Sequence, residues 1–436
     1  MSDATGVAEA MLGLDGFIVL AVREDPAELV ITVETTADLV GCAGCGVRAE
    51  AQDRMPIEIR DLSCFGRPTR LVWRKRRWRC REELCGVKTW TEVSPAAMSR
   101  QLITWRGAVE ACRQVGELAR PVSIVAAEFG VCWWTIMNAV IEHGTRLVDD
   151  PDRVGAVTQL GVDETSFLAA NRDHHTIYVS DLVDLHRHIV VDMFPGNSAA
   201  DLRKWTAKAA PGWLADVEVV ATDLTESYRA GLKPHLAHVT RVADPFHVVR
   251  VANRCLDKIR RRVQNETLGH RGRKDDPRFK IRKLMLTGAE RLDERGAERM
   301  LLGLRAGDPD DEVLGGWLAK ESVRDVYLTT IRDDAELLLD KAIAGCLADE
   351  VPEIVSLGET LAKWRPEILA YHQTGASNGP TEDLNLCVKK VKRCGHGFRR
   401  FEHYRLRVLL HTGGITWPDR PRPPRIRSRH SPHSNA

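Results

Sequence analysis

The spacing of apolar and polar residues divides the chain into segments with different expected structures. Residues 29–34 alternate apolar with polar side chains, which predicts a strand with one buried face. Residues 100–143 are expected to form helices joined by short turns. From residue 157 the pattern changes to short β-rich runs with brief links, which predict an antiparallel meander. These runs are 157–167, 175–185 and 187–194.

The pattern after the meander predicts an α/β domain followed by a long helical region. A helix is expected at 198–209, an apolar strand that ends at an aspartate at 217–224, and a further strand at 238–244. The resulting order, β-β-β-α-β-α, is that of a ribonuclease-H-like domain. Residues 246–372 are rich in helix-forming residues and poor in turn signals. Residues 378–395 are expected to form a helix that opens at Asn-Gly-Pro.

The composition limits the class of protein. With 436 residues, 43% of them hydrophobic and 28% charged, the chain has room for about two to four globular domains. No apolar run approaches the ~18 residues that span a bilayer, so an integral membrane protein is excluded. No basic stretch precedes an apolar one near the N-terminus, so a secretory signal is not expected. The odd number of cysteines, 11, favours a reducing compartment over a disulfide framework.

The charge is nearly balanced in total but unevenly distributed. The 63 Lys and Arg against 61 Asp and Glu give a net charge of +2, which by itself argues against a polycation that coats nucleic acid. Residues 1–60 hold 4 basic against 11 acidic residues, 61–95 hold 9 against 4, 241–283 hold 14 against 5, and 378–436 hold 13 against 4. The basic blocks indicate where DNA would bind. The tail, 416–436, is rich in Pro and Arg and is expected to be disordered.

Four cysteines fall into two close pairs, Cys42 with Cys45 and Cys80 with Cys85. Two short cysteine loops separated by 34 residues suit tetrahedral zinc, each loop supplying two thiolates to one ion. Such a site would be structural, because all four coordination positions are filled by protein. The alternative is four buried free cysteines, since cysteine is often simply buried. Cys64 has no near partner and is expected in the core.

A basic run at 70–81 leads directly into the second cysteine pair. Guanidinium groups interleaved with Trp suit phosphate contacts and base stacking, so this arm of a zinc ribbon is expected to bind DNA. The alternative is a solvated charged hairpin. Alternation on a strand would place Arg74, Arg76 and Trp78 on one face, and Lys75, Arg77 and Arg79 on the other.

Residues 122–140 fit a helix-turn-helix. That motif needs a small residue in the first helix, Gly in the turn and apolar residues at set offsets in the second helix. Those demands are met by Ala126, Gly130, Val131, Ile136 and Val140. The start of the second helix would then face the DNA major groove through Trp133, Trp134 and Thr135. The alternative is an ordinary helical hairpin.

Three acidic residues fall at strand ends or a helix start: Asp163, Asp223 and Glu382. The first and fourth strands of a ribonuclease-H-like sheet are adjacent, so the two aspartates would lie side by side, and a helix on the sheet can add the third carboxylate. Three converging carboxylates suit two Mg²⁺ ions. Any one acid taken singly is more often a surface charge. Three neighbouring acidic residues compete for these roles, but Glu164 points to the opposite face of its strand if Asp163 points in, and Glu226 and Asp383 are less well placed.

The last predicted helix combines a carboxylate with cations. Steps of 100° place Glu382, Asn385, Lys389 and Arg393 roughly on one face, which suits a DNA strand lying along the helix. Lys392 belongs to the same basic stretch and joins the expected DNA-binding residues. The alternative is a solvated amphipathic helix.

In this order the motifs resemble the DDE transposases of bacterial insertion sequences, of the type called IS-L-three, from about residue 40 to 412. The most specific segment is SNGPTEDLNLCVKKVKRCGHGFRRFEHYRLRVLL. The resemblance implies Asp163, Asp223 and Glu382 as the metal-binding triad, and a helical insertion between the fourth strand and the final helix. It also implies that Asp244 and His247, in Asp-Pro-Phe-His, shape the site. Cys132 departs from the Ser-like cap that the family more often has before the recognition helix.

We therefore expect a multidomain protein with a zinc ribbon, a helix-turn-helix and a ribonuclease-H-like α/β catalytic domain with an all-helical insertion. The expected divisions are 1–39 as an N-terminal strand segment, 40–95 as the zinc ribbon, 96–150 as the helix-turn-helix, 151–415 as the catalytic domain with its insertion at about 246–372, and 416–436 as the tail.

The expected function is that of a transposase that binds the terminal inverted repeats of its element and performs Mg-dependent DNA cleavage and strand transfer. The expected cofactors are two catalytic Mg²⁺ ions and one structural Zn²⁺. The expected partners are double-stranded DNA at transposon ends and target DNA, with no membrane, and a homodimer or larger active complex. The expected location is the cytoplasm, with the nucleoid. Two alternatives are a catalytically silent DNA-binding regulator and a ribonuclease-H-like nuclease that does not join DNA.

Overall fold

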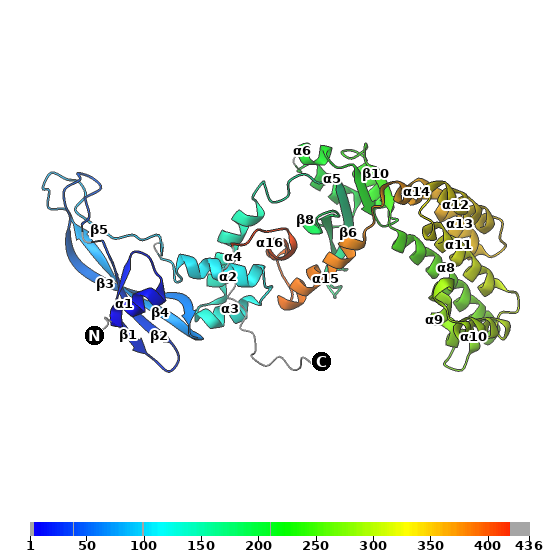
Figure 1. Ribbon diagram of the computed structural model, residues 1–436, viewed down its shortest axis with the longest axis horizontal. Coiled ribbons are helices and arrows are strands. Elements are labelled where there is room, and N and C mark those ends of the chain that lie inside the picture. Colours follow the sequence, from blue (N-terminus) through cyan, green and yellow to red (C-terminus); the bar gives the residue numbers. More distant parts are fainter. Residues whose placement is uncertain (1–3, 38, 98–99, 210, 419–436) are drawn as a thin grey trace, which may run out of the picture. The chain divides into compact units, whose positions relative to one another are not determined.

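The computed structural model describes residues 4–37, 39–97, 100–209 and 211–418 (Figure 1). Most of the tail predicted to be disordered, 419–436, lies outside these residues. The chain divides into two compact units, Met1–Arg153 with Gly414–Ala436, and Val154–Gly413.

The first unit contains a five-stranded sheet in the order β1-β2-β4-β3, with β5 paired to β4. Its elements are α1 (Ala4–Leu12), β1 (Phe17–Glu24), β2 (Leu29–Thr35), β3 (Glu50–Cys64), β4 (Arg67–Arg79) and β5 (Thr89–Thr91). The strand expected at 29–34 is confirmed as β2, whereas α1 and β1 were not predicted. Because β2 pairs in parallel with β4, residues before 40 share one sheet with the expected zinc ribbon and form no separate segment.

Three helices complete the first unit: α2 (Trp105–Gly116), α3 (Val122–Phe129) and α4 (Trp133–Val148). These confirm the helices expected within 100–143. α3 ends at Gly130, whose φ of 65° is a left-handed conformation that glycine adopts without strain. The axes of α3 and α4 then differ by 110°. Within the part of the chain that is described, no single helix is long and apolar enough to cross a membrane; only this bent pair meets those criteria, and only jointly.

The second unit is built on another five-stranded sheet, in the order β10-β9-β6-β7-β8. Its strands are β6 (Gln159–Leu168), β7 (Ile177–Asp184), β8 (Ile189–Pro195), β9 (Val219–Thr222) and β10 (Thr240–Ala243). β6, β7 and β8 form the predicted antiparallel meander, and β9 and β10 run parallel to β6. The expected adjacency of the first and fourth strands is therefore confirmed.

Helices cover both faces of this sheet. They are α5 (Ala199–Thr206), α6 (Pro211–Ala215), α7 (Glu226–Leu232), α15 (Gly379–Cys394) and α16 (Phe401–Thr412). Val162 of β6 points toward α5 and α7, where it packs in one core with Leu202 and Leu232. The next residue, Asp163, points to the opposite face, as alternation on a strand requires. There α15 packs on β6 and β7, and α16 packs on β8.

The close approach of α15 to β6 depends on Gly161. A Cβ at this position would lie 2.3 Å from Oγ1 of Thr381 and 2.8 Å from Oδ1 of Asn378, both at the start of α15. It would also lie 2.7 Å from the side chain of Leu185. Only glycine therefore lets the start of α15 rest on the strand that carries Asp163.

The helical insertion begins directly after β10. Its elements are α8 (Pro245–Leu268), α9 (Pro277–Leu286), the short 3-10 helix η1 (Ala289–Arg291), α10 (Glu294–Arg305), α11 (Glu312–Leu328), α12 (Arg332–Leu347), α13 (Pro352–Lys363) and α14 (Arg365–Thr374). The helical character expected for 246–372 is confirmed. The insertion lies between the fourth strand and the final helix, as the resemblance implied, and it begins after the strand expected at 238–244, which is β10 and pairs with β9.

Replacing Gly161 by Ala tests the packing of α15 on β6. The added methyl group must displace Thr381 and Asn378, so we expect the free energy of unfolding to fall by about 1–3 kcal/mol in urea denaturation. Gly345→Ala in α12 is the matched control, because its Cβ meets nothing within 4 Å. In a helix interior that change should stabilise by up to ~1 kcal/mol. Equal shifts in both variants would contradict the packing argument.

Candidate active site and metal centre

The four paired cysteines converge in the first unit. The sulfur atoms of Cys42 and Cys85 lie 3.7 Å apart and those of Cys45 and Cys80 lie 3.5 Å apart. All four sulfurs lie within 4.8 Å of one another. A zinc ion bound at ~2.3 Å by four tetrahedral sulfurs places them about 3.8 Å apart, so the cysteines fit zinc. In the described part of the chain, no other group of three or more His, Cys, Asp or Glu residues is gathered this closely.

The backbone around the first pair favours the thiolate form. The amide of Gly44 donates a hydrogen bond to Sγ of Cys42 at 3.4 Å and is the main cause that lowers the pKa of that thiol to about 7. A Cβ on Gly44 would lie 3.2 Å from Sγ of Cys85, so the knuckle needs glycine here. Zinc binds thiolates, and the loop favours that form at Cys42. The amide of Val47 also acts to lower the pKa of Cys45, but burial and the neighbouring thiols outweigh it and raise that pKa to about 12. Cys64, which was expected in the core, lies apart from the four and is only half-buried, packed against the edge of the core of the sheet.

The basic run on β4 is less exposed than the sequence predicted. Arg74, Arg77 and Arg79 are exposed, but Lys75 and Arg76 are only 8% and 6% exposed. The prediction that Lys75 and Arg76 lie on a DNA-binding surface is therefore wrong. Nζ of Lys75 lies 4.6 Å from the ring centroid of Trp73.

Arg76 is held by acidic residues from elsewhere in the unit. Its guanidinium lies 3.2 Å from Glu34 of β2, and its amide donates to Glu92 at 2.7 Å. The side of β4 that is covered changes between Lys75 and Arg76, and for this reason two consecutive residues are buried. Alternation alone could not reveal that change.

The start of α4 presents the predicted aromatic pair. Trp133 and Trp134 are 40% and 52% exposed, with their rings edge to face at 4.8 Å. Thr135 is half-buried, and its hydroxyl lies 3.2 Å from Sγ of Cys132. Cys132 is the N-cap residue but makes no side-chain capping bond, which confirms that the cap is weak.

The three predicted acidic residues lie at one end of the second sheet. Val162 of β6 is in register with Thr222, the last residue of β9, so Asp163 and Asp223 are the next residues on adjacent parallel strands. The prediction that Asp163 falls at a strand end is wrong, because β6 continues to Leu168 in its pairing with β7. Glu382 lies in the first turn of α15. One turn later, Nδ2 of Asn385 donates to Oδ2 of Asp163 at 2.6 Å, and this bond links the helix to the strand.

Asp163 is held from two sides. Its other oxygen, Oδ1, accepts a hydrogen bond from the amide of Glu164 at 2.8 Å. Burial, and to a smaller extent the negative charge of Asp223, raise the pKa of Asp163 to about 6. The carboxyl group thus lies in a place where a cation would be favourable.

His247 connects the other two acidic residues. Its Nδ1 lies 2.5 Å from Asp223 and 3.3 Å from Asp244, and its Nε2 lies 3.7 Å from Glu382. Burial alone lowers the pKa of His247, but the hydrogen bonds with Asp223 and Asp244 outweigh burial and raise it to about 9. Asp244 also caps α8 and accepts from the amide of Asn378 at 2.8 Å, just before α15. The Asp-Pro-Phe-His segment therefore joins the acidic ends of the sheet to α15.

The competing acidic residues are directed elsewhere. Glu164 accepts hydrogen bonds from Asn197 at 3.0 Å and from Tyr228 at 3.4 Å, on the opposite face of the sheet, as predicted. Glu226 pairs with Lys363 at 2.9 Å, and Asp383 is exposed.

Sequence reasoning missed Asp181 of β7. It stands directly opposite Asp163 on the neighbouring strand and is fully buried. Thr165 donates to its Oδ2 at 3.0 Å, while its Oδ1 has no hydrogen-bond partner among the described residues. Burial raises the pKa of Asp181 to about 8. The sequence feature that could have revealed Asp181 is a carboxyl group in the middle of the apolar run 175–185.

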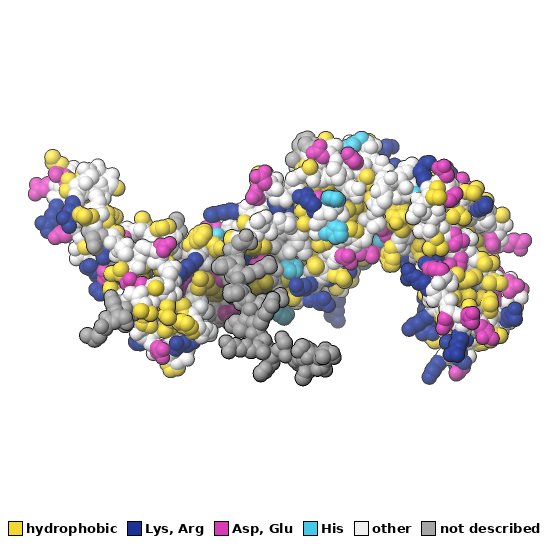
Figure 2. Space-filling view, in the orientation of Figure 1, with side chains coloured by type: hydrophobic (Ala, Val, Ile, Leu, Met, Phe, Trp, Pro, Cys, Tyr) yellow, Lys and Arg dark blue, Asp and Glu magenta, His cyan; other side chains and the backbone are white. Residues whose placement is uncertain are grey.

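Basic residues continue along α15 from the acidic end. Lys389 and Arg393 are exposed, and Nζ of Lys392 donates to the carbonyl of Ser166 at 2.6 Å. All three line a pocket of about 500 Å³ with Leu386. Figure 2 shows Lys and Arg side chains gathered beside the end of α15.

Comparison with known proteins gives the class of this chain, which is that of the transposases. Residues 38–85 match the zinc finger of the transposases of IS204, IS1001, IS1096 and IS1165. Residues 160–408, more than half of the chain, match the transposase family of the IS-L-three type. The chain belongs to this family, as the sequence predicted, and carries the zinc ribbon of its members at the N-terminal end.

Several known proteins are similar over long stretches. The transposase for insertion sequence element IS1001 of Bordetella parapertussis is 26% identical, over 92% of this chain and 96% of that protein. The transposase for IS1557 of Mycobacterium tuberculosis is 27% identical, over 62% of this chain and 63% of that protein. The Drosophila P element transposase strand transfer complex aligns over 70% of this chain and 90% of that one, with 12% identity and a TM-score of 0.36.

The zinc centre can be tested by replacing one ligand. The wild-type chain should hold one zinc ion by elemental analysis, and Cys80→Ser should lose it because three sulfurs leave the tetrahedral site open. Cys64→Ser is the matched control, since Cys64 lies in the same unit outside the four-sulfur group. Zinc retained in the Cys80 variant, or lost equally in both, would argue against this site.

Proposed function

We propose that this transposase binds the terminal inverted repeats of its insertion sequence, cleaves DNA at the element ends, and joins the 3′ ends to target DNA. The observation that supports it most strongly is the joining of three acidic residues at one end of the second sheet. Asp163 lies within β6, Asp223 directly follows the adjacent parallel strand β9, and Glu382 is tied to both through Asn385 and His247. The strand order matches that of a ribonuclease-H-like sheet, on which we place the catalytic domain.

The residues at this end suit Mg²⁺, which prefers oxygen ligands. Asp163, Asp223 and Glu382 would hold two ions. The neighbouring Oδ1 atoms of Asp181 and Asn385 are buried and accept no hydrogen bond in the described part of the chain, so oxygen atoms remain available to a cation or its water. When bound, the ions would activate the attacking oxygen and stabilise the leaving oxygen.

The protein's own part in this reaction is to hold the carboxylates and the DNA. Asn385 and the amide of Glu164 fix both oxygens of Asp163. His247, oriented by Asp244, fixes Asp223 beside Glu382, which makes it a positioning residue. No side chain serves as nucleophile, because water and then the DNA 3′-hydroxyl attack the phosphorus directly.

Sequence recognition is assigned to the first unit. The 110° bend between α3 and α4 falls within the range of a helix-turn-helix, so α4 would enter the major groove with Trp133, Trp134 and Thr135 at its start. The exposed Arg74, Arg77 and Arg79 of the zinc ribbon would contact phosphates. Paired element ends require at least a dimer in the active complex.

The carboxylate assignment predicts that binding and cleavage can be separated. Asp163→Asn keeps the size of the side chain but removes its charge, so we expect Mg-dependent cleavage of end-containing DNA to fall about a thousandfold or more, with end binding retained. Asp383→Asn, an exposed acid next to Glu382, is the control and should cleave normally. Normal cleavage by the Asp163 variant would overturn the triad.

The same assay separates the alternatives. A wild-type chain that binds ends but never cleaves them is a regulator. A chain that cleaves but fails to join pre-cut ends to target DNA is a nuclease. Joining of pre-cut ends supports the transposase.

The helix-turn-helix assignment predicts a loss of specific binding. Replacing Trp133 and Trp134 by Ala should weaken binding to the inverted repeat by about 10- to 100-fold, because contacts to base edges are each worth ~1–3 kcal/mol. Binding to unrelated DNA should hardly change. Trp105→Ala is the matched control, an exposed Trp at the start of α2. Gel-shift measurements at one salt concentration compare the affinities of the two variants for the inverted repeat. An equal loss of affinity in the Trp105 variant would contradict the assignment.

A further inference from the structure

A groove of about 500 Å³ runs between α8 and α13 of the helical insertion. It takes part in none of the contacts described above. α8 contributes charged and apolar side chains to it, and α13 contributes two hydroxyl groups. The lining residues used below are Arg254, Lys258, Glu353, Ser356 and Thr360.

The groove carries positive charge that the protein does not neutralise. Arg254 and Lys258 are exposed and have no ion pair among the described residues. The carboxylate in the lining, Glu353, is bound by Arg262 at 2.8 Å from Nε to Oε1. Arg262 also pairs with Glu266 and Glu312, and Lys258 adds to Arg262 in lowering the pKa of Glu353, so the groove holds two cations against one carboxylate that is partly neutralised by Arg262. Two cations therefore face solvent beside the hydroxyl groups of Ser356 and Thr360. This chemistry fits the anionic backbone of a nucleic acid.

The row of cations starts at the acidic site. Nη2 of Arg250 lies 3.3 Å from Oδ2 of Asp223, and His247 lies in the first turn of α8 itself. Arg254 and Lys258 follow at intervals of four residues, about 6 and 12 Å further along the helix axis. At ~3.4 Å per base pair, they reach phosphates about two to four base pairs from the reacting bond.

α8 and α15 carry the two basic rows that leave the acidic end of the sheet, and Figure 1 shows them running away from each other. DNA that passes through the site would extend on both sides of the cleaved bond. The groove offers positive charge from α8 and hydroxyl groups from α13, which is the chemistry of contacts to phosphates, and such contacts carry no sequence information directly. It therefore suits DNA whose sequence varies from one insertion site to the next.

We propose that the α8–α13 groove holds the phosphate backbone of the flanking duplex, the DNA just outside the element end. Arg254 and Lys258 contact its phosphates, and Ser356 donates a hydrogen bond to them. The hydroxyl of Thr360 already donates to the carbonyl of Ser356 at 2.9 Å and only lines the groove. The inference rests on the proposed function, because it takes the acidic site as the point of cleavage.

The experiment compares full-length chains on duplexes that contain the element end with no flank or with 10 base pairs of flank, in the absence of Mg²⁺. For the wild type, the flank should strengthen binding. Arg254→Ala with Lys258→Ala should bind the flanked duplex about tenfold or more weakly than the wild type, and the unflanked duplex equally well. On flanked DNA, the slope of log K against log salt should fall by about two in this variant.

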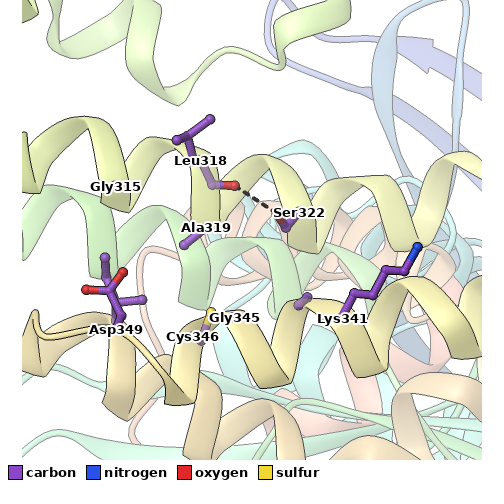
Figure 3. A pocket seen from close by; sticks show the side chains of 10 residues that line it. Gly315, Leu318, Ala319, Ser322, Lys341, Gly345, Cys346 and Asp349 are labelled. Atoms are coloured by element: carbon purple, nitrogen blue, oxygen red, sulfur yellow. Dashed lines mark hydrogen bonds between the residues drawn. The ribbon is translucent and has the colours of Figure 1, made fainter.

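A matched control removes the same charge elsewhere in the second unit. Lys233 and Lys341 are exposed and lie outside the groove. Figure 3 shows Lys341 at one end of a smaller pocket of about 210 Å³ between α11 and α12, with the carboxylate of Asp349 at the other end. Lys233→Ala with Lys341→Ala should bind both duplexes like the wild type.

Three results would overturn the proposal: no gain of wild-type affinity from the flank, an equal loss of affinity on the unflanked duplex, or an equal loss in the control. Failure of the proposed function is a separate result, since it is the absence of cleavage and joining by the wild type when Mg²⁺ is added. Flank-dependent binding that needs Arg254 and Lys258 would support the groove even in that case.

Discussion

The hydrogen bond from Asn385 to Asp163 joins residues 222 positions apart in the sequence, and the acidic site depends on it. Between these residues the chain completes the sheet and then passes through the whole helical insertion. α15 must return to β6 after that excursion, and Gly161 leaves the space in which it can do so. The entropic cost of closing a long loop grows only slowly with its length. A large insertion is therefore compatible with a site whose third carboxylate, Glu382, lies on a helix that follows the insertion in the sequence.

In the acidic site, basic side chains offset the charge of partly buried carboxylates. Asp163, Asp223 and Glu382 would repel one another in the absence of cations, and burial makes each charge costly. His247 lies between two of them, and Arg250 reaches Asp223, so two basic side chains offset the carboxylates. Asp181 is buried behind Asp163 with a raised pKa, a carboxyl group that adds oxygen atoms while favouring its neutral form. The site therefore holds many carboxyl oxygen atoms, and nearby basic side chains offset part of their negative charge in the folded chain.

The sequence predicted those features that depend on the spacing of residues within one segment. The meander, the apolar strand before Asp223, the helical insertion and the four cysteines were all readable, because periodicity and spacing determine them. The unpredicted parts depend on distant partners. β1 pairs with β2, and Lys75 and Arg76 are buried because different elements cover the two faces of β4. Asp181 was missed because a single acid in an apolar run has no periodicity.

The number of basic residues in a segment indicates a binding surface only when their ion-pair partners in the folded chain are known. The acidic segment 1–60 supplies Glu28 to Arg60 and Arg70, and Glu34 to Arg76, so part of the basic run on β4 is neutralised within its own unit. On α8, Arg262 is likewise matched by Glu312 and Glu353, whereas Arg254 and Lys258, on the same helix, are not. A basic block thus contains both structural cations and cations left for a partner. We propose that the second kind forms a DNA surface, and the ion pairs of the folded chain are what distinguish the two kinds.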